Sequence, residues 1–355
     1  MRKLVIDRAA IKNNLTVIKD RAAGAAIYGV LTGDGQGVGA AALAQLLRAE
    51  GIGRFAVSEV SEAEALRQAG FVDEEILMLR ATTDREELER LVDLNVVCTV
   101  SSVDTGMALN ALAGNRSTVA EAHIQVDTGM GFGGFLVSEP EKLLLAYRSM
   151  PNVALSGVYT QLHAARPNDP QAKRQLEQFQ QALDAIHQAG FETGVVHAAG
   201  SFALLHGLAP ELDGVRAGSA ILGRCRRTRD DGLKTVGFGQ APLTEVRWLP
   251  KGHVLGVDRP VTLKKPTRVA VLPVGYQNGF GVTRPRETGL LAAIARWRKN
   301  NRRTVRLGSQ RSRVLGGLGA SELILDVTDV KCSVGDLATF EIDPLFARGF
   351  QVEFR

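Results

Sequence analysis

The sequence has few cysteines and no long apolar run, and each absence excludes a class of protein. Its three cysteines, Cys98, Cys225 and Cys332, are far apart and form no Cys-x-x-Cys pair. We therefore expect reduced thiols, not a disulfide framework or a zinc site. No stretch of about 18 apolar residues occurs, so we expect no membrane-spanning helix. Residues 1–7 lack the apolar core of a secretion signal, and we expect a cytoplasmic protein.

Several catalytic signatures are also missing. The sequence contains no G-x-S-x-G elbow, no P-loop, and no H-E-x-x-H, paired-histidine or D-x-D spacing. A serine hydrolase built on that elbow, a phosphate-loop NTPase and a metalloprotease are therefore not expected. Because no group of residues has the spacing of metal ligands, we expect no metal ion.

Basic charge is concentrated in one stretch. The whole chain carries a formal net charge of +5, from 43 basic and 38 acidic residues. Residues 284–313 contain ten arginines and lysines but a single acidic residue, Glu287, so the remainder of the chain is net acidic. Such a stretch can bind nucleic acid. No RNP, zinc-finger or helix-turn-helix signature accompanies it, so we expect a solvated surface segment and no nucleic-acid partner.

Short apolar runs recur through the first two thirds of the chain. Each run is bounded by turn residues, as is typical of buried parallel strands. The eight expected strands are 26–31, 55–57, 76–79, 96–100, 123–126, 155–159, 195–197 and 215–222.

Helix-start signals lie between these runs. Ser61 with Glu64, and Asp84 with Glu87, have the spacing of N-terminal capping pairs. Asp169 precedes a proline and a long segment with apolar residues at helical spacing. The chain therefore alternates strand and helix.

The spacing of the strands indicates the architecture. One strand in about every 25 residues suits a parallel (β/α)8 barrel. A doubly wound sheet is the alternative, but no G-x-G-x-x-G follows the first strand. After about residue 225 short apolar runs are separated by Gly, Pro and Asp, which is typical of a β-rich domain. We predict an α/β fold, with a TIM barrel over 1–225 and a C-terminal β-rich domain over 226–355.

Functional residues of a parallel barrel lie at the C-terminal ends of its strands. The residues at those ends are Thr32 and Asp34 after the first strand, Asp127 and Thr128 after the fifth, Gln161 and His163 after the sixth, Gly200 and Ser201 after the seventh, and Arg216 and Gly218 on the eighth.

Three of these positions suggest an anion pocket. Ser201 stands at the start of a short predicted helix, where backbone N–H groups can bind an anion, although a simple N-cap is an equal interpretation. Gly218 and Ser219 offer further N–H groups. Arg216 lies inside an apolar strand, so it must be paired or directed at a ligand. His123 and His197 also lie within strands, where a hydrogen-bonded core histidine is the simpler interpretation than a ligand.

Seven segments, in order along nearly the whole chain, carry a family resemblance. They are 28–39, against V-x-K-x-[DN]-x-Y-G-x-G; 56–63, against a second βα turn; 123–135, against H-x-K-x-D-T-G-M-x-R-x-G-F; 156–161, against G-x-x-T-H-F; 215–218, against V-R-x-G; 273–279, against P-x-G-Y-x-D-G; and 325–336, against the closing strands. With these segments the sequence resembles the alanine racemases, the fold-type III enzymes that use pyridoxal phosphate (PLP).

The resemblance implies that both proton carriers of the reaction are replaced. Thr32 stands where the family has the lysine that forms the Schiff base, and threonine has no amine. Val257 stands where the family has a catalytic tyrosine, and valine transfers no proton. The resemblance implies that six further sites also differ from the family's residues. This chain has Gln36, Gln125, Phe132, Gln161, Asn278 and Ala320-Ser321 at those sites.

The resemblance also implies a retained, vestigial pocket. Arg216 would face the pyridine nitrogen, and Ser201, Gly218 and Ser219 would form the phosphate cradle. Other pocket candidates are Asp34, Asp127, Met130, His163 and Tyr276.

We therefore predict an alanine-racemase-like pseudoenzyme with no covalent cofactor. It would bind noncovalent PLP, another phosphate or a small anion, or a protein partner, and the resemblance implies a homodimer. Two alternatives stay open. One is an enzyme of altered chemistry that uses Asp34, Asp127, His163 and Tyr276 as acid and base groups. The other is a conventional alanine racemase, an isomerase whose motifs are displaced.

Overall fold

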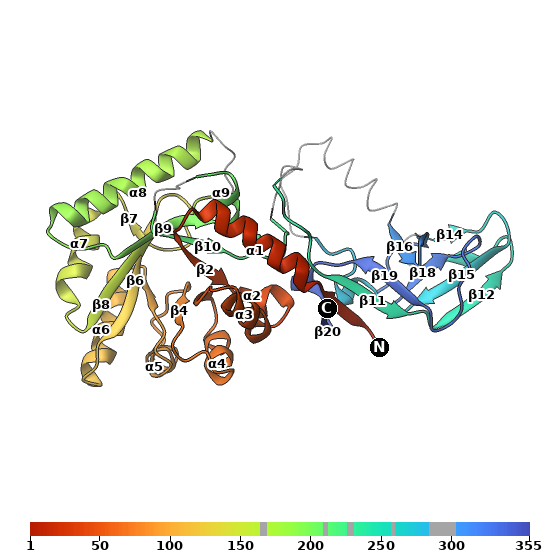
Figure 1. Cartoon of the computed structure of the whole chain (residues 1–355), viewed down its shortest axis with the longest axis horizontal. Helices are drawn as coiled ribbons and strands as arrows, with labels where there is room; N and C mark the ends of the chain where they lie inside the picture. The colour runs from red at the N-terminus through yellow and green to blue at the C-terminus, as the bar shows by residue number, and fades with distance from the viewer. Residues whose placement is uncertain (164–168, 209–211, 226–230, 257–259, 284–302) are drawn as a thin grey trace. The chain divides into compact units, whose positions relative to one another are not determined.

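The computed structural model describes residues 1–163, 169–208, 212–225, 231–256, 260–283 and 303–355. Its contacts divide the chain into two compact units (Figure 1). The barrel unit is Ala9–Thr235, and the β unit combines Met1–Arg8 with Val236–Arg355. Among the described residues no helix is long and apolar enough to cross a membrane.

Parallel strands form the centre of the barrel unit. Within its described residues eight of them follow one another in the order β4-β3-β2-β10-β9-β8-β6-β5. They are β2 (Ala26–Val30), β3 (Arg54–Val57), β4 (Glu75–Met78), β5 (Cys98–Val100), β6 (Ala120–Asp127), β8 (Val153–Tyr159), β9 (Val195–Gly200) and β10 (Gly214–Ala217), and the short β7 (Phe135–Leu136) pairs with β6.

The first and last strands of this order also meet. Leu77 of β4 forms a parallel bridge with Val97, directly before β5. Met78 N donates to Val97 O and Val97 N donates to Ile76 O, each at 2.8 Å. Closure removes both sheet edges, and the predicted (β/α)8 barrel is confirmed.

Helices alternate with these strands along the chain (Figure 1). They are α1 (Arg8–Ala22), α2 (Thr32–Gly37), α3 (Ala40–Ala49), α4 (Val60–Gln68), α5 (Arg85–Asp93), α6 (Val103–Asn115), α7 (Pro140–Ser149), α8 (Pro170–Gln188) and α9 (Ser201–Leu205). Two predicted starts are confirmed, because Asp84 accepts from Glu87 N and Asp169 accepts from Gln171 N.

Two local predictions are wrong. The capping pair of α4 is not Ser61 with Glu64, since the helix starts two residues earlier, after Glu59. The buried Glu62 carboxylate accepts from the backbone N of Ser58 and Glu59, and these bonds fix the earlier start. The eighth strand ends at Ala217, not at 222, because Ile221 N donates back to Gly218 O and turns the chain.

Antiparallel strands dominate the β unit, as predicted for the C-terminal part. Nine of its described strands form one sheet in the order β12-β15-β18-β17-β16-β19-β11-β1-β20. The strands of the unit are β1 (Lys3–Ile6), β11 (Phe238–Pro242), β12 (Glu245–Leu249), β13 (Val254–Leu255), β14 (Val261–Thr262), β15 (Thr267–Leu272), β16 (Thr304–Leu307), β17 (Gln310–Leu315), β18 (Leu323–Asp326), β19 (Leu337–Glu341) and β20 (Gln351–Phe354), with 3-10 turns η1 (Tyr276–Asn278) and η2 (Pro344–Phe346).

The N-terminal strand belongs to this sheet. β1 pairs antiparallel with β11 and parallel with β20. Residues 1–8 were predicted as part of the barrel domain, whereas their contacts place them in the β unit. Strand pairing across more than 200 residues leaves no local signal, so this assignment depends on tertiary structure.

Candidate functional site

Arg216 is the central polar residue of the barrel interior. Only 4% of its surface is exposed. One terminal nitrogen, NH1, donates to His197 Nδ1 at 2.6 Å, and the other, NH2, donates to Thr160 O at 2.7 Å and Gln161 Oε1 at 2.9 Å. The guanidinium carbon also lies 5.1 Å from the centre of the Tyr159 ring. The prediction that this arginine must be paired or directed at a ligand is met in part by neutral groups of the barrel.

The arginine sets the tautomers of two buried histidines. A guanidinium only donates, so His197 Nδ1 must accept and its proton lies on Nε2. His197 Nε2 lies 3.0 Å from His123 Nδ1 and donates to it. The rings of Tyr28 and Tyr159 stack on His197, with centroids 5.1 and 5.0 Å away. Both histidines are therefore hydrogen-bonded core residues, as the simpler interpretation predicted.

Burial keeps this cluster at low charge. Desolvation, with Arg216 nearby, lowers the pKa of His123 to about 4 and holds the pKa of His197 well below its usual value. Burial also lowers the pKa of Arg216 to about 10, which leaves it protonated at neutral pH. The cluster then carries a single positive charge, on the arginine.

The loop after β2 has an unusual backbone. From Gly33 to Gln36 every residue has positive φ and ψ, so α2 contains a left-handed turn. Such angles are costly for Asp34 and Gln36, which carry a Cβ. The side chain of Gln36 fastens the turn, because its Nε2 donates to Thr32 O at 3.0 Å and to Thr32 Oγ1 at 3.1 Å.

Asp34 serves the same loop. Its N donates to Glu62 Oε1 at 3.0 Å, and its Oδ1 accepts from Ala40 N at 2.8 Å. These bonds hold the left-handed turn against α3 and α4. Asp34 therefore has a structural position, and nothing in its contacts assigns it an acid or base role.

Ser201 and Gly218 lie together at the ends of β9 and β10. Ser201 Oγ accepts from Gly218 N at 2.9 Å and from Ala220 N at 3.2 Å. Ser201 does not cap its own helix, since Gly200 is the N-cap of α9. Ser219 follows Gly218 in the same turn. The predicted cradle groups do meet, but here the Gly218 N–H is bonded to Ser201.

Asp127 holds together the glycine-rich loop that follows β6 by accepting hydrogen bonds from the loop's own backbone. Asp127 Oδ1 accepts from the N of Gly129, Met130 and Gly131, at 2.8, 2.9 and 3.2 Å. Asp127 is therefore a cap of its loop, and Met130 contributes a backbone donor to that cap. The side chain of Phe132, at the tip, is 80% exposed.

His163 is held by two partners beyond the end of β8. Its Nδ1 lies 2.7 Å from Gln175 Oε1, and its Nε2 lies 3.3 Å from Asp169 Oδ2. Gln175 Nε2 donates to Gln161 O and Thr128 Oγ1, which fixes the orientation of the amide. An imidazole between an amide oxygen and a carboxylate has the arrangement of an oriented acid or base group.

The remaining predicted residues lie in or near the β unit. Tyr276 is 51% exposed in η1. Asn278 supports that turn, because its Oδ1 accepts from Gly275 N and its Nδ2 donates to Arg348 O. Val257 and residues 284–302 of the basic stretch lie outside the described residues. In the described part, residues 303–313 of that stretch include β16 and part of β17.

Sequence reasoning missed two buried polar residues, Gln175 and Glu62. Gln175 lies on the buried face of α8, and a polar residue on that apolar face was an available signal. Glu62 stands three residues after the N-cap Glu59, which is the spacing of a capping box and was an available local signal, whereas its bond from Asp34 N forms only in the fold. Among the residues that the structure describes, no cluster could hold a metal ion.

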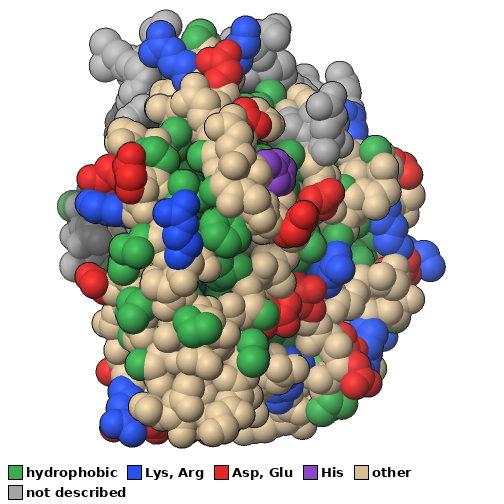
Figure 2. Space-filling model, turned by 90° about the vertical axis from the view of Figure 1, so that its left-hand side faces the viewer, with side chains coloured by type: hydrophobic (Ala, Val, Ile, Leu, Met, Phe, Trp, Pro, Cys, Tyr) green, Lys and Arg blue, Asp and Glu red, His purple; other side chains and the backbone are tan. Residues whose placement is uncertain are grey.

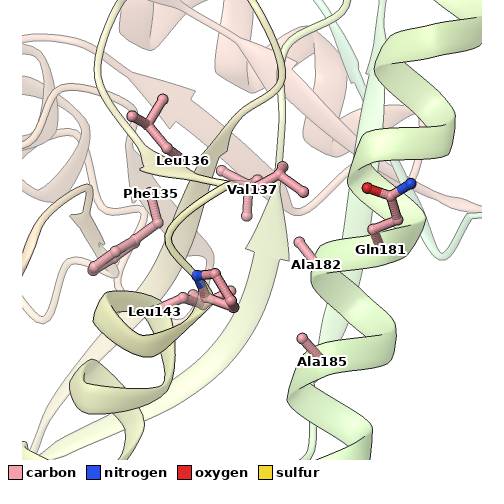
Figure 3. Close-up of a pocket in the computed structure, with 9 residues that line it drawn as sticks. Phe135, Leu136, Val137, Leu143, Gln181, Ala182 and Ala185 are labelled. Carbon is pink, nitrogen blue, oxygen red and sulfur yellow. The ribbon is translucent and has the colours of Figure 1, made fainter.

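An apolar pocket lies elsewhere on the barrel unit. It has about 140 Å³ of free space among β6, β7, α7 and α8. Figure 3 shows Phe135 and Leu143 on one side of it, and Ala182 and Gln181 facing them from α8 on the other. Figure 2 shows apolar, basic and acidic side chains interspersed over one face of the molecule. The lining offers no charged group to orient a polar ligand.

Two family models match the chain. Residues 6–225 match "Alanine racemase, N-terminal domain" and residues 239–342 match "Alanine racemase, C-terminal domain". The alanine racemase of Desulfovibrio desulfuricans is 30% identical over 341 residues, which are 93% of this chain and 86% of that protein. The alanine racemase of Clostridium tetani is 29% identical over 283 residues, 78% of this chain and 72% of that protein.

Solved structures share the fold. An alanine racemase of Clostridium difficile 630 superposes with a TM-score of 0.87 at 21% identity, covering 100% of this chain and 95% of that one. The alanine racemase of Bartonella henselae, solved with covalently bound pyridoxal phosphate, gives a TM-score of 0.84 at 20% identity, covering 100% and 99%.

Proposed function

The chain belongs to the alanine racemase family, and we propose that it is a pseudoenzyme, keeping the fold but not the PLP-dependent racemase reaction. The observation that carries this proposal is Thr32. It stands at the position of the family's Schiff-base lysine, and no lysine occurs between Lys19 and Lys142. A hydroxyl cannot form an imine with an aldehyde. We therefore infer that no covalently held PLP fits this site, and we assign no reaction step through it.

The surroundings of Thr32 support the same interpretation. Its Oγ1 and O accept from Gln36 Nε2, and Gln36 is itself a replaced position. Gln161, which replaces a family histidine, accepts from Arg216. Two replaced residues, Thr32 and Gln36, thus bond to each other, and the replaced Gln161 bonds to the retained Arg216. The position of the second proton carrier holds Val257, which supports the same proposal.

The test is a search for the reaction itself. Purified protein would be mixed with PLP, scanned for the absorption band of a lysine–PLP Schiff base, and assayed for interconversion of D- and L-alanine. We expect neither. Cofactor-dependent turnover by the pure protein would establish the conventional racemase instead.

A second candidate function is an enzyme of altered chemistry. The observation that favours it is His163, held between Gln175 Oε1 and Asp169 Oδ2. Of the four groups predicted for such chemistry, Asp34 and Asp127 are committed to backbone caps. Thermal-shift screens with PLP, amino acids and sugar phosphates would test it, since a ligand at about 100 times its dissociation constant adds about 2.7 kcal/mol. No stabilisation by any of them would reject it.

The assembly is also a proposal. We infer a homodimer from family membership. A catalytically silent subunit would act by binding a protein partner. We propose that it does so in the cytoplasm. We also propose the domain boundary near residue 225, where the match to the N-terminal family model ends, although the contacts divide the two units at Thr235. Mass photometry at micromolar concentration would show a dimer, and a monomer would remove this inference.

A further inference from the structure

The apolar pocket of the barrel unit is separate from the candidate site. It lies among the paired strands β6 and β7 and the helices α7 and α8 (Figure 3). Val126 and Phe135 are directly opposite each other in the β6–β7 pairing, and both line the pocket. Neither Ser201 nor Arg216 belongs to the lining. A ligand held here would therefore not touch the retained residues of the barrel interior.

Two alanines of α8 leave the space of this pocket open. Ala182 and Ala185 are three positions apart, so they lie on the same side of the helix, and both line the pocket. The buried residues that follow them, Leu183 and Ile186, have larger side chains. About 140 Å³ remains free beside the two alanines. An unfilled void leaves the atoms around it without contacts on one side, which is unfavourable until a molecule occupies it.

Water is a poor occupant of this pocket. A buried water molecule makes two to four hydrogen bonds to polar groups. Eight of the nine lining residues have apolar side chains, and the ninth, Gln181, is exposed. An apolar cavity of about 150 Å³ stays dry and takes up benzene. The free space in this chain has nearly the same size, so its size and its lining both suit an uncharged molecule of about six carbon atoms.

The lining also offers a route for a ligand and excludes anions. Leu136 lines the pocket, yet 46% of its surface is exposed, so the pocket borders solvent at this residue. Phe135 and Leu143, by contrast, are buried and form inner walls. Because no cationic side chain lines the pocket, a carboxylate or phosphate would lose its water without gaining a partner.

We propose that this pocket binds a small uncharged apolar molecule of the size of benzene. Burial of apolar surface against α7, α8 and β7 drives the binding. The inference goes beyond the proposed function and does not depend on it, because the lining contains none of the residues by which the racemase reaction is judged.

Filling the pocket with a side chain of the protein tests the proposal. Ala182→Leu adds three carbon atoms from α8, and both residues are good helix formers. The matched control is Gln178→Leu, which places the same side chain on the exposed face of the same helix. A second variant, Ala185→Val, adds only two carbon atoms and so guards against overpacking. Far-UV circular dichroism would show that each variant is folded.

Each full-length protein would be titrated with benzene, and with benzoate as its charged analogue, by calorimetry in a sealed cell and by thermal denaturation. We expect saturable, one-to-one binding of benzene by the unmodified protein and by Gln178→Leu. The affinity should fall at least tenfold in Ala182→Leu and in Ala185→Val. Benzoate should give no saturable binding to any of the four proteins.

Three results would overturn the apolar site. They are no saturable binding of benzene by the unmodified protein, equal binding of benzoate, and unchanged benzene affinity in both filling variants, which would place the ligand elsewhere. The proposed function is judged separately, by the PLP spectrum and the alanine assay. An active racemase would therefore be recognised whatever the benzene titration shows.

Discussion

Gln36 Nε2 lies 3.1 Å from Thr32 Oγ1 and 3.0 Å from Thr32 O. In the function we propose, both residues replace groups that the family uses on PLP, and in this chain they bond to each other. The bond also fastens a left-handed turn that places positive φ on Asp34 and Gln36. The bonds of Gln36 to Thr32 therefore make residues 32–37 a locally stabilised turn, and we propose that this turn takes the place of the family's cofactor-lysine loop.

Replacing Gln36 should therefore weaken the fold. Gln36→Ala removes both hydrogen bonds that the buried Gln36 side chain donates to Thr32, and these bonds stabilise the left-handed turn. We expect a loss of about 1–2 kcal/mol in the free energy of unfolding, measured by urea denaturation. The exposed Gln178→Ala should change stability by less than about 0.5 kcal/mol. Equal effects of the two variants would show that the Gln36 bonds contribute nothing.

Gly157 should not tolerate a methyl group. A Cβ at this position would lie 2.6 Å from ring atoms of His123, which Tyr28 and His197 hold in place. We expect Gly157→Ala to lower stability by about 1–3 kcal/mol, as overpacked cores do. Gly53→Ala is the matched control, since its Cβ would meet nothing closer than Glu74 Cγ at 3.8 Å. A stable Gly157→Ala protein would mean that His123 can leave its place.

The buried histidines should make stability depend on pH. The pKa of His123 is about 4 in the folded chain and about 6.5 when unfolded, so only the unfolded state gains the proton between these values. The stabilising contribution of the neutral histidines is therefore complete above pH 6.5. Below that pH the free energy of unfolding falls, by up to about 1.4 kcal/mol per pH unit for each such histidine. Denaturation curves at pH 7, 6 and 5 should show this, with a smaller slope in His123→Asn. If the free energy of unfolding of His123→Asn changed with pH as steeply as that of the unmodified protein, groups other than His123 would cause the pH dependence.

Restoring the lysine should restore only part of the chemistry. Thr32→Lys with added PLP should show the Schiff-base absorption band, because the new side chain supplies an amine, and we expect no such band from the unmodified protein. It should not interconvert D- and L-alanine, since Val257 supplies no second proton carrier. The double variant Thr32→Lys with Val257→Tyr should give measurable turnover. Racemisation by Thr32→Lys alone would show that another residue acts as that carrier.

Much of the architecture could be predicted from local patterns. The eight apolar runs became the eight barrel strands, because each is short and apolar, and two of the helices between them begin at the predicted caps Asp84 and Asp169. The start of α4 was placed two residues late, because Glu59 with Glu62 and Ser61 with Glu64 have the same capping spacing, and the structure shows that Glu62 makes the capping bonds. The pairing of β1 with β11 and β20 was missed because both partners lie more than 200 residues away.

The sequence by itself determined which chemical groups are present. Threonine at 32 cannot itself form a Schiff base in any fold, because its side chain has no amine. Only the tertiary structure decided what the retained groups do. Asp34 and Asp127 became backbone caps, and Ser201 became the acceptor of Gly218 N. Arg216 became a buried cation among neutral acceptors, because the closed barrel brings β8, β9 and β10 side by side and no carboxylate among the described residues comes with them.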